Sequence, residues 1–232
     1  MVFFATRGLL GPSGTNAGDI DVGTEVILNE NGQPVNYLIV NQGIPSALYD
    51  ASCEGTWLLR KDVAENRQWH RSNSNAYGPS TINAYLNGDW LDRYDPAVAE
   101  AIVQAKIPYV NGTGNSAVAS GANGLSCKIF LLSGREVGFS TSDNKYFPND
   151  GAKLSYFESG TGSSALNKRI AKLNGSATNW WLRSPRASGD SLAWLVNSNG
   201  DCTGGNCSNS YGVRPTLILP YEFKFQDDQI AA

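Results

Sequence analysis

Two short blocks of aromatic, arginine and proline residues enclose a polar segment near the end of the chain. The first block is residues 179–185 (Asn-Trp-Trp-Leu-Arg-Ser-Pro) and the second is residues 212–215 (Gly-Val-Arg-Pro). Residues 186–211 between them are crowded with Ser, Asn, Gly and Asp. Small polar residues with isolated aromatics are typical of binding surfaces held on a rigid scaffold. The same residues are also the commonest turn formers, so composition alone leaves an ordinary hairpin with polar loops as the alternative.

The bulk composition describes a folded protein and excludes some classes of partner. With 232 residues and 41% hydrophobic content, the chain can bury the core of one large domain or two small ones. Its 18 basic and 21 acidic residues give a net charge of −3 without a long basic run, so we expect no nucleic acid partner. No apolar run approaches the roughly 20 residues of a membrane span. Residues 1–10 lack the basic leading segment of a signal peptide.

The chain divides into an arm, one domain and a tail. Residues 1–18 are rich in Gly, Ser, Thr and Pro and indicate an N-terminal arm or linker. Residues 19–220 carry the strand and helix patterns of a domain, and residues 221–232 resemble a short strand that fades into a tail.

Strand patterns dominate this domain. Two β-rich runs at 22–28 and 35–40 are separated by Asn31-Gly32, a strong hairpin signal. Further strands are expected at 57–60, 127–132, 180–183, 192–197 and 213–219.

Helix patterns are fewer and short. Ser80 or Thr81 can cap a helix whose residues Ile82, Tyr85 and Leu86 share one face. Pro96 suits the first position of a second helix that continues to Ala105, and residues 163–173 form a third pattern. Together with 25 glycines, these patterns predict an α+β domain with short antiparallel sheets, two to three short helices and much irregular loop.

The sequence lacks a recognisable catalytic constellation. His70 is the only histidine, and no Gly-x-Ser-x-Gly motif accompanies it. Glycine pairs at 112–114 and 160–162 lack the spacing and the Lys of a phosphate-binding loop. We therefore expect no enzyme activity and no cofactor.

One close cysteine pair, Cys202 and Cys207, has three interpretations. The pair can close a local disulfide, stay as free thiols, or form half of a metal site. The first two are favoured over the third, because structural zinc takes four ligands and no matching Cys or His pair is present. No metal site is expected.

Several separated motifs resemble a family of gut-bacterial and phage proteins. In that family Trp-Leu-Arg-Ser-Pro and Gly-Val-Arg-Pro flank an Asn/Ser/Tyr-rich hairpin, as residues 181–185 and 212–215 do here. Residues 65–69, 81–87 and 106–109 also match, so the resemblance covers roughly residues 19–220. Such proteins are similar to C-type-lectin-fold domains of the formylglycine-generating-enzyme branch.

This family includes targets of diversity-generating retroelements, which rewrite adenines and so randomise chosen codons of the C-terminal hairpin. A template Asn codon can become Ser, Asp, Gly, Tyr or Thr among others, whereas Trp codons contain no adenine. The resemblance thus implies a C-type-lectin-like fold whose hairpin at 180–215 has fixed ends and a variable middle. The implied scaffold residues are Trp180, Trp181, Arg183, Pro185, Gly212, Arg214 and Pro215.

The variable middle would present the ligand-binding surface. Its strongest contacts are expected at Arg186, Trp194 and Tyr211, since these residue types dominate interface energies. The full expected surface is Arg186, Ser188, Asp190, Ser191, Ala193, Trp194, Asn197, Asn199, Asp201, Thr203, Asn206, Ser208, Asn209 and Tyr211.

The function that the resemblance implies is receptor binding without catalysis. The expected partner is a protein or glycan on a bacterial cell surface, bound from a phage tail, a tail fibre or another bacterial surface. Monomeric and homo-oligomeric display suit the fold equally. One alternative is a surface or structural domain that is not diversified. Another is an oxidase of the formylglycine-generating type using Cys202 and Cys207, which lack supporting acid and base groups.

Overall fold

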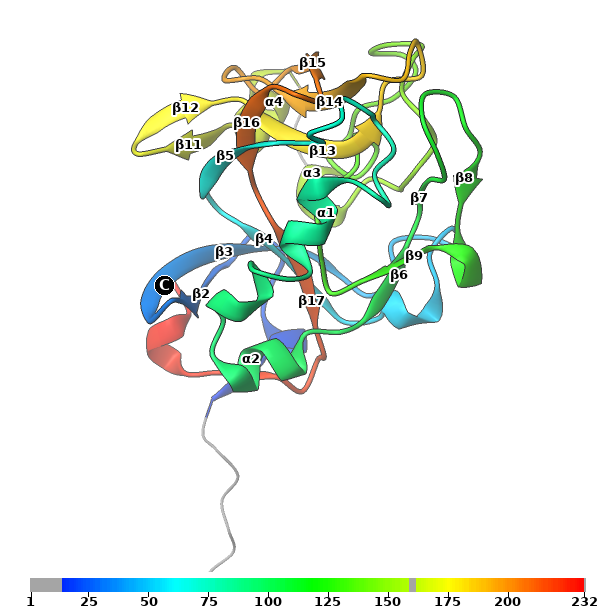
Figure 1. Ribbon diagram of the computed structural model, residues 1–232. Helices are drawn as coiled ribbons and strands as arrows, with labels where there is room; N and C mark the ends of the chain where they lie inside the picture. Colours follow the sequence, from blue (N-terminus) through cyan, green and yellow to red (C-terminus); the bar gives the residue numbers. More distant parts are fainter. Residues whose placement is uncertain (1–13, 159–161, 232) are drawn as a thin grey trace, which may run out of the picture.

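Two five-stranded sheets form the frame of the protein. The computed structural model describes residues 14–158 and 162–231. Strands predominate, the helices are short, and four smaller two-stranded sheets complete the described residues (Figure 1). The α+β class expected from the sequence is confirmed.

The lower sheet of Figure 1 is antiparallel and has the order β10-β17-β4-β3-β2. A tight turn joins β2 to β3, where Asn31 and Gly32 both have positive φ angles of 52° and 72°. This geometry is the one that favours Asn-Gly in a hairpin, so the sequence signal is confirmed. The strands are β2 (Glu25–Glu30), β3 (Gln33–Gln42), β4 (Thr56–Arg60), β10 (Ile129–Phe130) and β17 (Thr216–Leu219).

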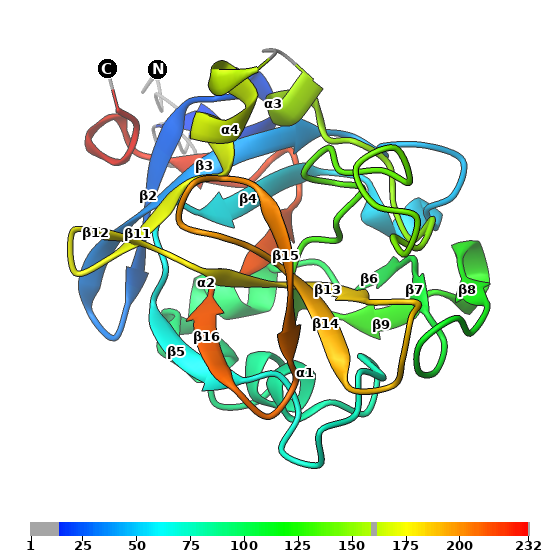
Figure 2. The ribbon, with the colours of Figure 1, turned by 90° about the horizontal axis from the view of Figure 1, so that it is seen from above.

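The upper sheet contains the polar segment and both of its flanking blocks. Its order is β15-β14-β13-β16-β5, and only the β13 and β16 pair is parallel (Figure 2). Residues 180–215 are therefore not one hairpin. They form a three-stranded meander followed by a strand on the other side of β13. The strands are β5 (Glu65–Gln68), β13 (Trp180–Pro185), β14 (Leu192–Val196), β15 (Cys202–Asn206) and β16 (Ser210–Val213).

The described residues include four short α-helices. The Ser80 side chain accepts a hydrogen bond from the Asn83 backbone N–H at 3.2 Å and caps α1, as predicted. Pro96 begins α2, also as predicted, yet this helix ends at Ala101. The helices are α1 (Thr81–Leu86), α2 (Pro96–Ala101), α3 (Ser155–Glu158) and α4 (Ser163–Arg169).

Strand pairing explains why two helices are shorter than the sequence predicts. Ala105 pairs with Cys127, and Ala171 pairs with Thr178, so both segments are extended. The small sheets are β6 (Ala105–Ile107) with β9 (Leu125–Cys127), β7 (Tyr109–Val110) with β8 (Val118–Ala119), β11 (Ala171–Leu173) with β12 (Ser176–Thr178), and β1 (Thr15–Asn16) with β18 (Lys224–Phe225). Short 3₁₀ turns lie at Ala17–Asp19, Ala51–Cys53, Leu91–Arg93, Gly121–Asn123 and Asp227–Gln229.

The two ends of the described chain belong to the domain. Thr15 pairs with Phe225, which is fully buried, and Ile230 forms an isolated bridge to Val26. The boundaries expected for an arm at 1–18 and a tail at 221–232 are wrong for these residues, because apolar side chains near both ends complete the core. The rest of the expected arm, residues 1–13, lies outside the described residues.

Both faces of the central upper strands are covered. Trp181 and Leu195 belong to one hydrophobic cluster, whereas Trp180, Leu182 and Trp194 belong to a second. Alternate side chains of a strand point to opposite faces, so β13 and β14 separate the two clusters. Within the described ranges, none of the helices combines the length and the apolarity needed to span a bilayer.

Candidate functional site

Arg183 in β13 ties the first flanking block to the centre of the protein. Its guanidinium donates to the Glu136 carboxylate at 2.5 and 2.6 Å, and both side chains are fully buried. The remaining donors reach the backbone carbonyls of Pro108, Leu131 and Asp150 at 3.0, 2.9 and 3.1 Å. All five N–H donors are thus used, and Glu136 raises the pKa of Arg183 although burial alone would lower it.

A second buried carboxyl group lies beside this ion pair. The Ser184 hydroxyl donates to Asp150 Oδ2 at 2.8 Å, while Asp150 Oδ1 has no hydrogen-bond partner. Burial raises the pKa of Asp150 from its ordinary value of 3.8 to about 6, against the opposing effect of Arg183.

Arg214 differs from Arg183 in its partners. Its Nε donates to the Arg60 carbonyl at 2.8 Å and its guanidinium lies 4.8 Å from the Trp180 ring centre, yet its buried Nη1 has no acceptor. Burial lowers the pKa of Arg214 to about 10. It holds the second block to β4, and it forms no ion pair with a carboxylate in the part of the chain that the structure describes.

The other scaffold residues are buried as expected. Trp180 and Trp181 are fully buried and donate their indole N–H groups to the carbonyls of Arg169 and Arg67, both at 2.9 Å. Gly212 donates to the Asn179 carbonyl, and an added Cβ would lie only 2.7 Å from that oxygen. Pro185 and Pro215 are also buried.

Most of the residues expected on the ligand-facing surface are accessible. Six are exposed, namely Ser188, Asp190, Asn199, Asp201, Thr203 and Asn209. Another six are half-buried, namely Arg186, Ser191, Asn197, Asn206, Ser208 and Tyr211.

Two of the expected surface residues, Ala193 and Trp194, are buried, so their assignment is wrong. Trp194 is 2% exposed, stacks on Phe147 at 4.1 Å, and donates to the Tyr146 carbonyl at 3.3 Å. The cause is the central position of β14, between β13 and β15 and with both faces covered. The unbroken apolar run at 192–196 is the sequence signal of such a strand.

Some of the accessible residues also shape their own turns. Asn197 Oδ1 accepts from the backbone N–H groups of Asn199 and Asp201, and Asn206 Oδ1 accepts from that of Ser208. Arg186 lies over the rings of Tyr146 and Trp194 at 5.1 and 5.4 Å, and Tyr211 packs edge-on against Trp181. Side-chain hydrogen bonds and ring contacts of this kind are not found for Ser188, Asp190, Ser191, Asn199, Thr203 and Asn209 within the described residues.

Asn75 holds the loop between β13 and β14 from below. This fully buried side chain donates to the carbonyls of Gly189 and Leu192, both at 2.8 Å, and accepts from the Gly114 N–H at 2.9 Å. Its backbone N–H donates to the Asp190 carbonyl at 2.7 Å. Sequence reasoning missed Asn75 and Glu136, because neither belongs to a motif.

The two close cysteines are free, so the local disulfide is wrong and the free-thiol interpretation holds. Cys202 begins β15 and Cys207 directly follows its last residue, so the two lie roughly 16 Å apart at about 3.3 Å per residue, beyond disulfide reach. Burial raises their pKa values to about 11 and about 12, which disfavours the reactive thiolate.

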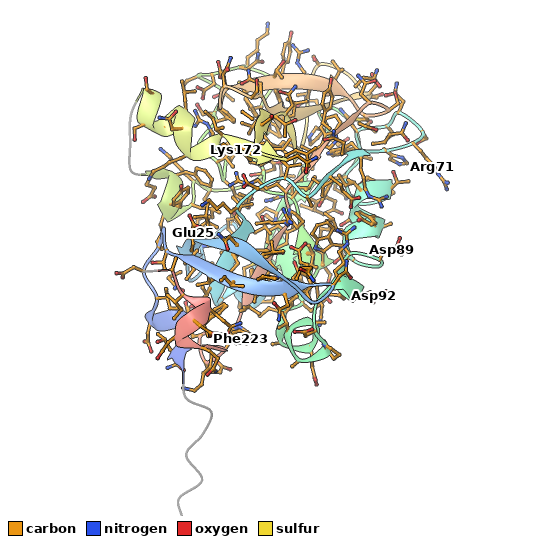
Figure 3. All side chains as sticks on the ribbon, turned by 90° about the vertical axis from the view of Figure 1, so that its left-hand side faces the viewer. Glu25, Arg71, Asp89, Asp92, Lys172 and Phe223 are labelled. Carbon is orange, nitrogen blue, oxygen red and sulfur yellow. The ribbon has the colours of Figure 1, made fainter. Side chains whose placement is uncertain are left out.

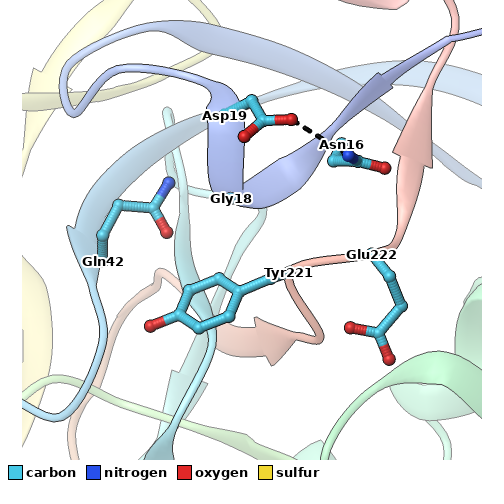
Figure 4. A pocket seen from close by; sticks show the side chains of 6 residues that line it. All are labelled: Asn16, Gly18, Asp19, Gln42, Tyr221 and Glu222. Atoms are coloured by element: carbon cyan, nitrogen blue, oxygen red, sulfur yellow. Dashed lines mark hydrogen bonds between the residues drawn. The ribbon is translucent and has the colours of Figure 1, made fainter.

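A separate cavity of about 520 Å³ lies beside the paired chain ends (Figure 4). Its lining includes Asp19, Gln42, Tyr221 and Glu222, and Asn16 donates to Asp19 at 2.9 Å. No residue of the polar segment at 186–211 is among those that line this cavity.

Comparison with known proteins gives one family match. The model of a domain of unknown function, DUF6273, matches residues 54–221, which include the polar segment and both flanking blocks. No curated protein and no solved structure is significantly similar to the chain.

Proposed function

We propose that this chain, which belongs to the DUF6273 family, binds a receptor through the polar surface between Arg186 and Tyr211. The proposed receptor is a protein or glycan on a bacterial cell, and binding involves no catalysis. We define the recognition surface as the twelve accessible residues Arg186, Ser188, Asp190, Ser191, Asn197, Asn199, Asp201, Thr203, Asn206, Ser208, Asn209 and Tyr211.

The observation that carries this proposal is the separation between the recognition surface and the groups that support it. Arg183, Glu136 and Asn75 are buried and hold the backbone from beneath through hydrogen bonds. None of them belongs to the recognition surface. Exposed side chains on a frame fixed in this way can be exchanged with little effect on the backbone.

The proposal also covers the specific fold of the domain and the origin of its sequence variation. We assign a C-type-lectin-like fold whose recognition surface is diversified by a retroelement, on a phage tail or a bacterial surface. The order of the motifs from residue 65 to residue 215 supports this assignment. The burial of Trp180 and Trp181, whose codons adenine rewriting cannot change, supports it too.

Binding of labelled protein to glycan arrays and to intact gut-bacterial cells tests the proposal. Replacing both Asp190 and Asp201 by Ala removes two exposed carboxylates from the recognition surface. The matched control replaces Asp89 and Asp92, exposed aspartates below the upper sheet (Figure 3). We expect binding that the first variant weakens and the control preserves. Equal loss in both variants, or no binding to any cell or glycan, contradicts the proposal.

A further inference from the structure

A second cavity, of about 310 Å³, lies on the side of the protein between the two sheets. Residues from β2, β3, α3, α4 and β11 line it, together with Arg214. Figure 3 shows this side, with Lys172 of β11 above Glu25 of β2. It is distinct from the recognition surface, none of whose residues line it.

Arg214 brings a buried charge to this cavity. The residue is 1% exposed, and no carboxylate among the described residues forms an ion pair with it. Its Nη1 lacks an acceptor, while Arg183 in the same protein satisfies every donor. A buried guanidinium without a counter-charge is costly, and such an unsatisfied group is often explained by a bound ion.

The remaining charges of the cavity favour an anion. Lys61, Lys168 and Lys172 line it with Arg214, against the two carboxylates of Glu25 and Asp62. Glu25 is already paired with Lys61 at 2.5 Å, and Asp62 Oδ1 accepts the backbone N–H of Lys172 at 2.9 Å. Both carboxylates therefore have partners, whereas neither Arg214 nor Lys172 forms an ion pair with a carboxylate of the described residues.

Lys168 and Lys172 differ in how they are held. Lys168 donates to the Tyr156 carbonyl at 2.7 Å and lies 4.7 Å from that ring, which fixes its position at the cavity. Lys172 is exposed, so its ammonium group can reach a bound ion at the entrance. The apolar side chains of Leu38 and Ile170, together with Asn167, complete the lining.

We propose that this cavity binds a small oxyanion, either a phosphate or a carboxylate group, with Arg214 and Lys172 as its principal cationic contacts. A guanidinium presents paired donors that match both groups, and an ammonium adds a point charge. The volume is at the lower end of small-molecule sites, so the ligand is a small ion or the charged end of a larger molecule.

Calorimetry with inorganic phosphate and with succinate, at an ionic strength held constant with sodium chloride, tests this site. We expect saturable 1:1 binding of at least one anion and a rise in Tm that follows the same saturation curve. Binding of phosphate alone assigns a phosphate site, and binding of succinate alone assigns a carboxylate site.

Charge reversal at the exposed Lys172 tests binding without disturbing the buried Arg214, on which folding depends. Lys172→Glu changes an exposed side chain. It should raise the dissociation constant of the anion about tenfold or more, as expected for loss of a charge-assisted contact. Lys224→Glu, at an exposed residue near the chain ends, is the control for net charge. The absence of saturable binding, or equal weakening in both variants, overturns the proposal. The folding of each variant is checked by its Tm without added anion.

Discussion

Arg183 and Glu136 form a buried ion pair in which each oxygen of the carboxylate accepts from a different nitrogen of the guanidinium. Glu136 also accepts from the Tyr49 hydroxyl at 2.7 Å and from the Ser133 N–H at 2.8 Å. The pair therefore joins the first flanking block to two loops that are distant in sequence. The ion pair thereby fixes β13 beneath the recognition surface.

Glu136→Gln should be strongly destabilising. The variant leaves Arg183 charged and buried without the carboxylate that accepts two of its hydrogen bonds, which costs about 3–5 kcal/mol. Urea unfolding followed by tryptophan fluorescence measures the loss. The control is Glu25→Gln, which breaks the more exposed pair with Lys61 and should cost about 0–1 kcal/mol. Similar losses in the two variants would contradict the bracing role of the buried pair.

Asn75→Ala should loosen the loop above it. The substitution removes buried hydrogen bonds to Gly189, Leu192 and Gly114, and we expect a loss of about 1–3 kcal/mol. Hydrogen exchange should also become faster in residues 186–192 than elsewhere in the upper sheet. Asn123→Ala, at an exposed residue, provides the matched control. Unchanged exchange in the loop would show that Asn75 does not hold it.

Asp150 should make the protein less stable as the pH rises. Its pKa is about 6 in the folded state and near 3.8 when unfolded, so the folded state binds the proton more tightly. The contribution to stability is fully present below about pH 4 and is lost as the pH rises through about 6.

Asp150→Asn isolates this contribution. The variant should match the parent protein near pH 4 and become more stable than it by up to about 3 kcal/mol near pH 7. Urea unfolding over this range measures the difference, with Asp92→Asn as the control for loss of an exposed carboxylate. A difference that does not change with pH would refute this assignment.

Truncation to Ala should lower the stability of the protein strongly at Trp194 and hardly at all at Asn209. Trp194→Ala removes a buried ring stacked on Phe147 and should cost about 3–5 kcal/mol. Asn209→Ala changes an exposed side chain and should stay within about 0.5 kcal/mol. Thermal unfolding of both variants measures this contrast, and a tolerant Trp194 would return it to the recognition surface.

Local signals in the sequence were sufficient for the local structure. Asn31-Gly32 specifies its turn through two positive φ angles, and Ser80 specifies a helix start through its side-chain oxygen. Such features depend on only a few neighbouring residues. The apolar and arginine-containing flanking blocks were likewise predictable as a buried scaffold, because large aromatic side chains are costly to expose.

Features that depend on distant partners were not predictable in the same way. The second and third expected helices end early because Ala105 pairs with Cys127, 22 residues further along, and Ala171 pairs with Thr178, 7 residues further along. Glu136 and Asn75 acquire their roles only when the fold brings them beneath β13 and the 186–192 loop. Trp194 was assigned to the surface because the wider segment 186–211 is polar, although its own strand at 192–196 is apolar and its neighbours in space are Phe147 and Tyr146.

The proposed function requires that the recognition surface varies while its buried scaffold stays fixed. Sequencing the gene region for residues 180–215, with its flanking DNA, in many closely related genomes measures this variation. We predict a nearby reverse transcriptase gene and a near-repeat of this region. The repeat should differ from the gene only at adenines, in codons of recognition-surface residues, and leave the codons of Trp180, Trp181 and Trp194 unchanged. Differences spread over other bases, or falling equally on scaffold codons, would contradict it.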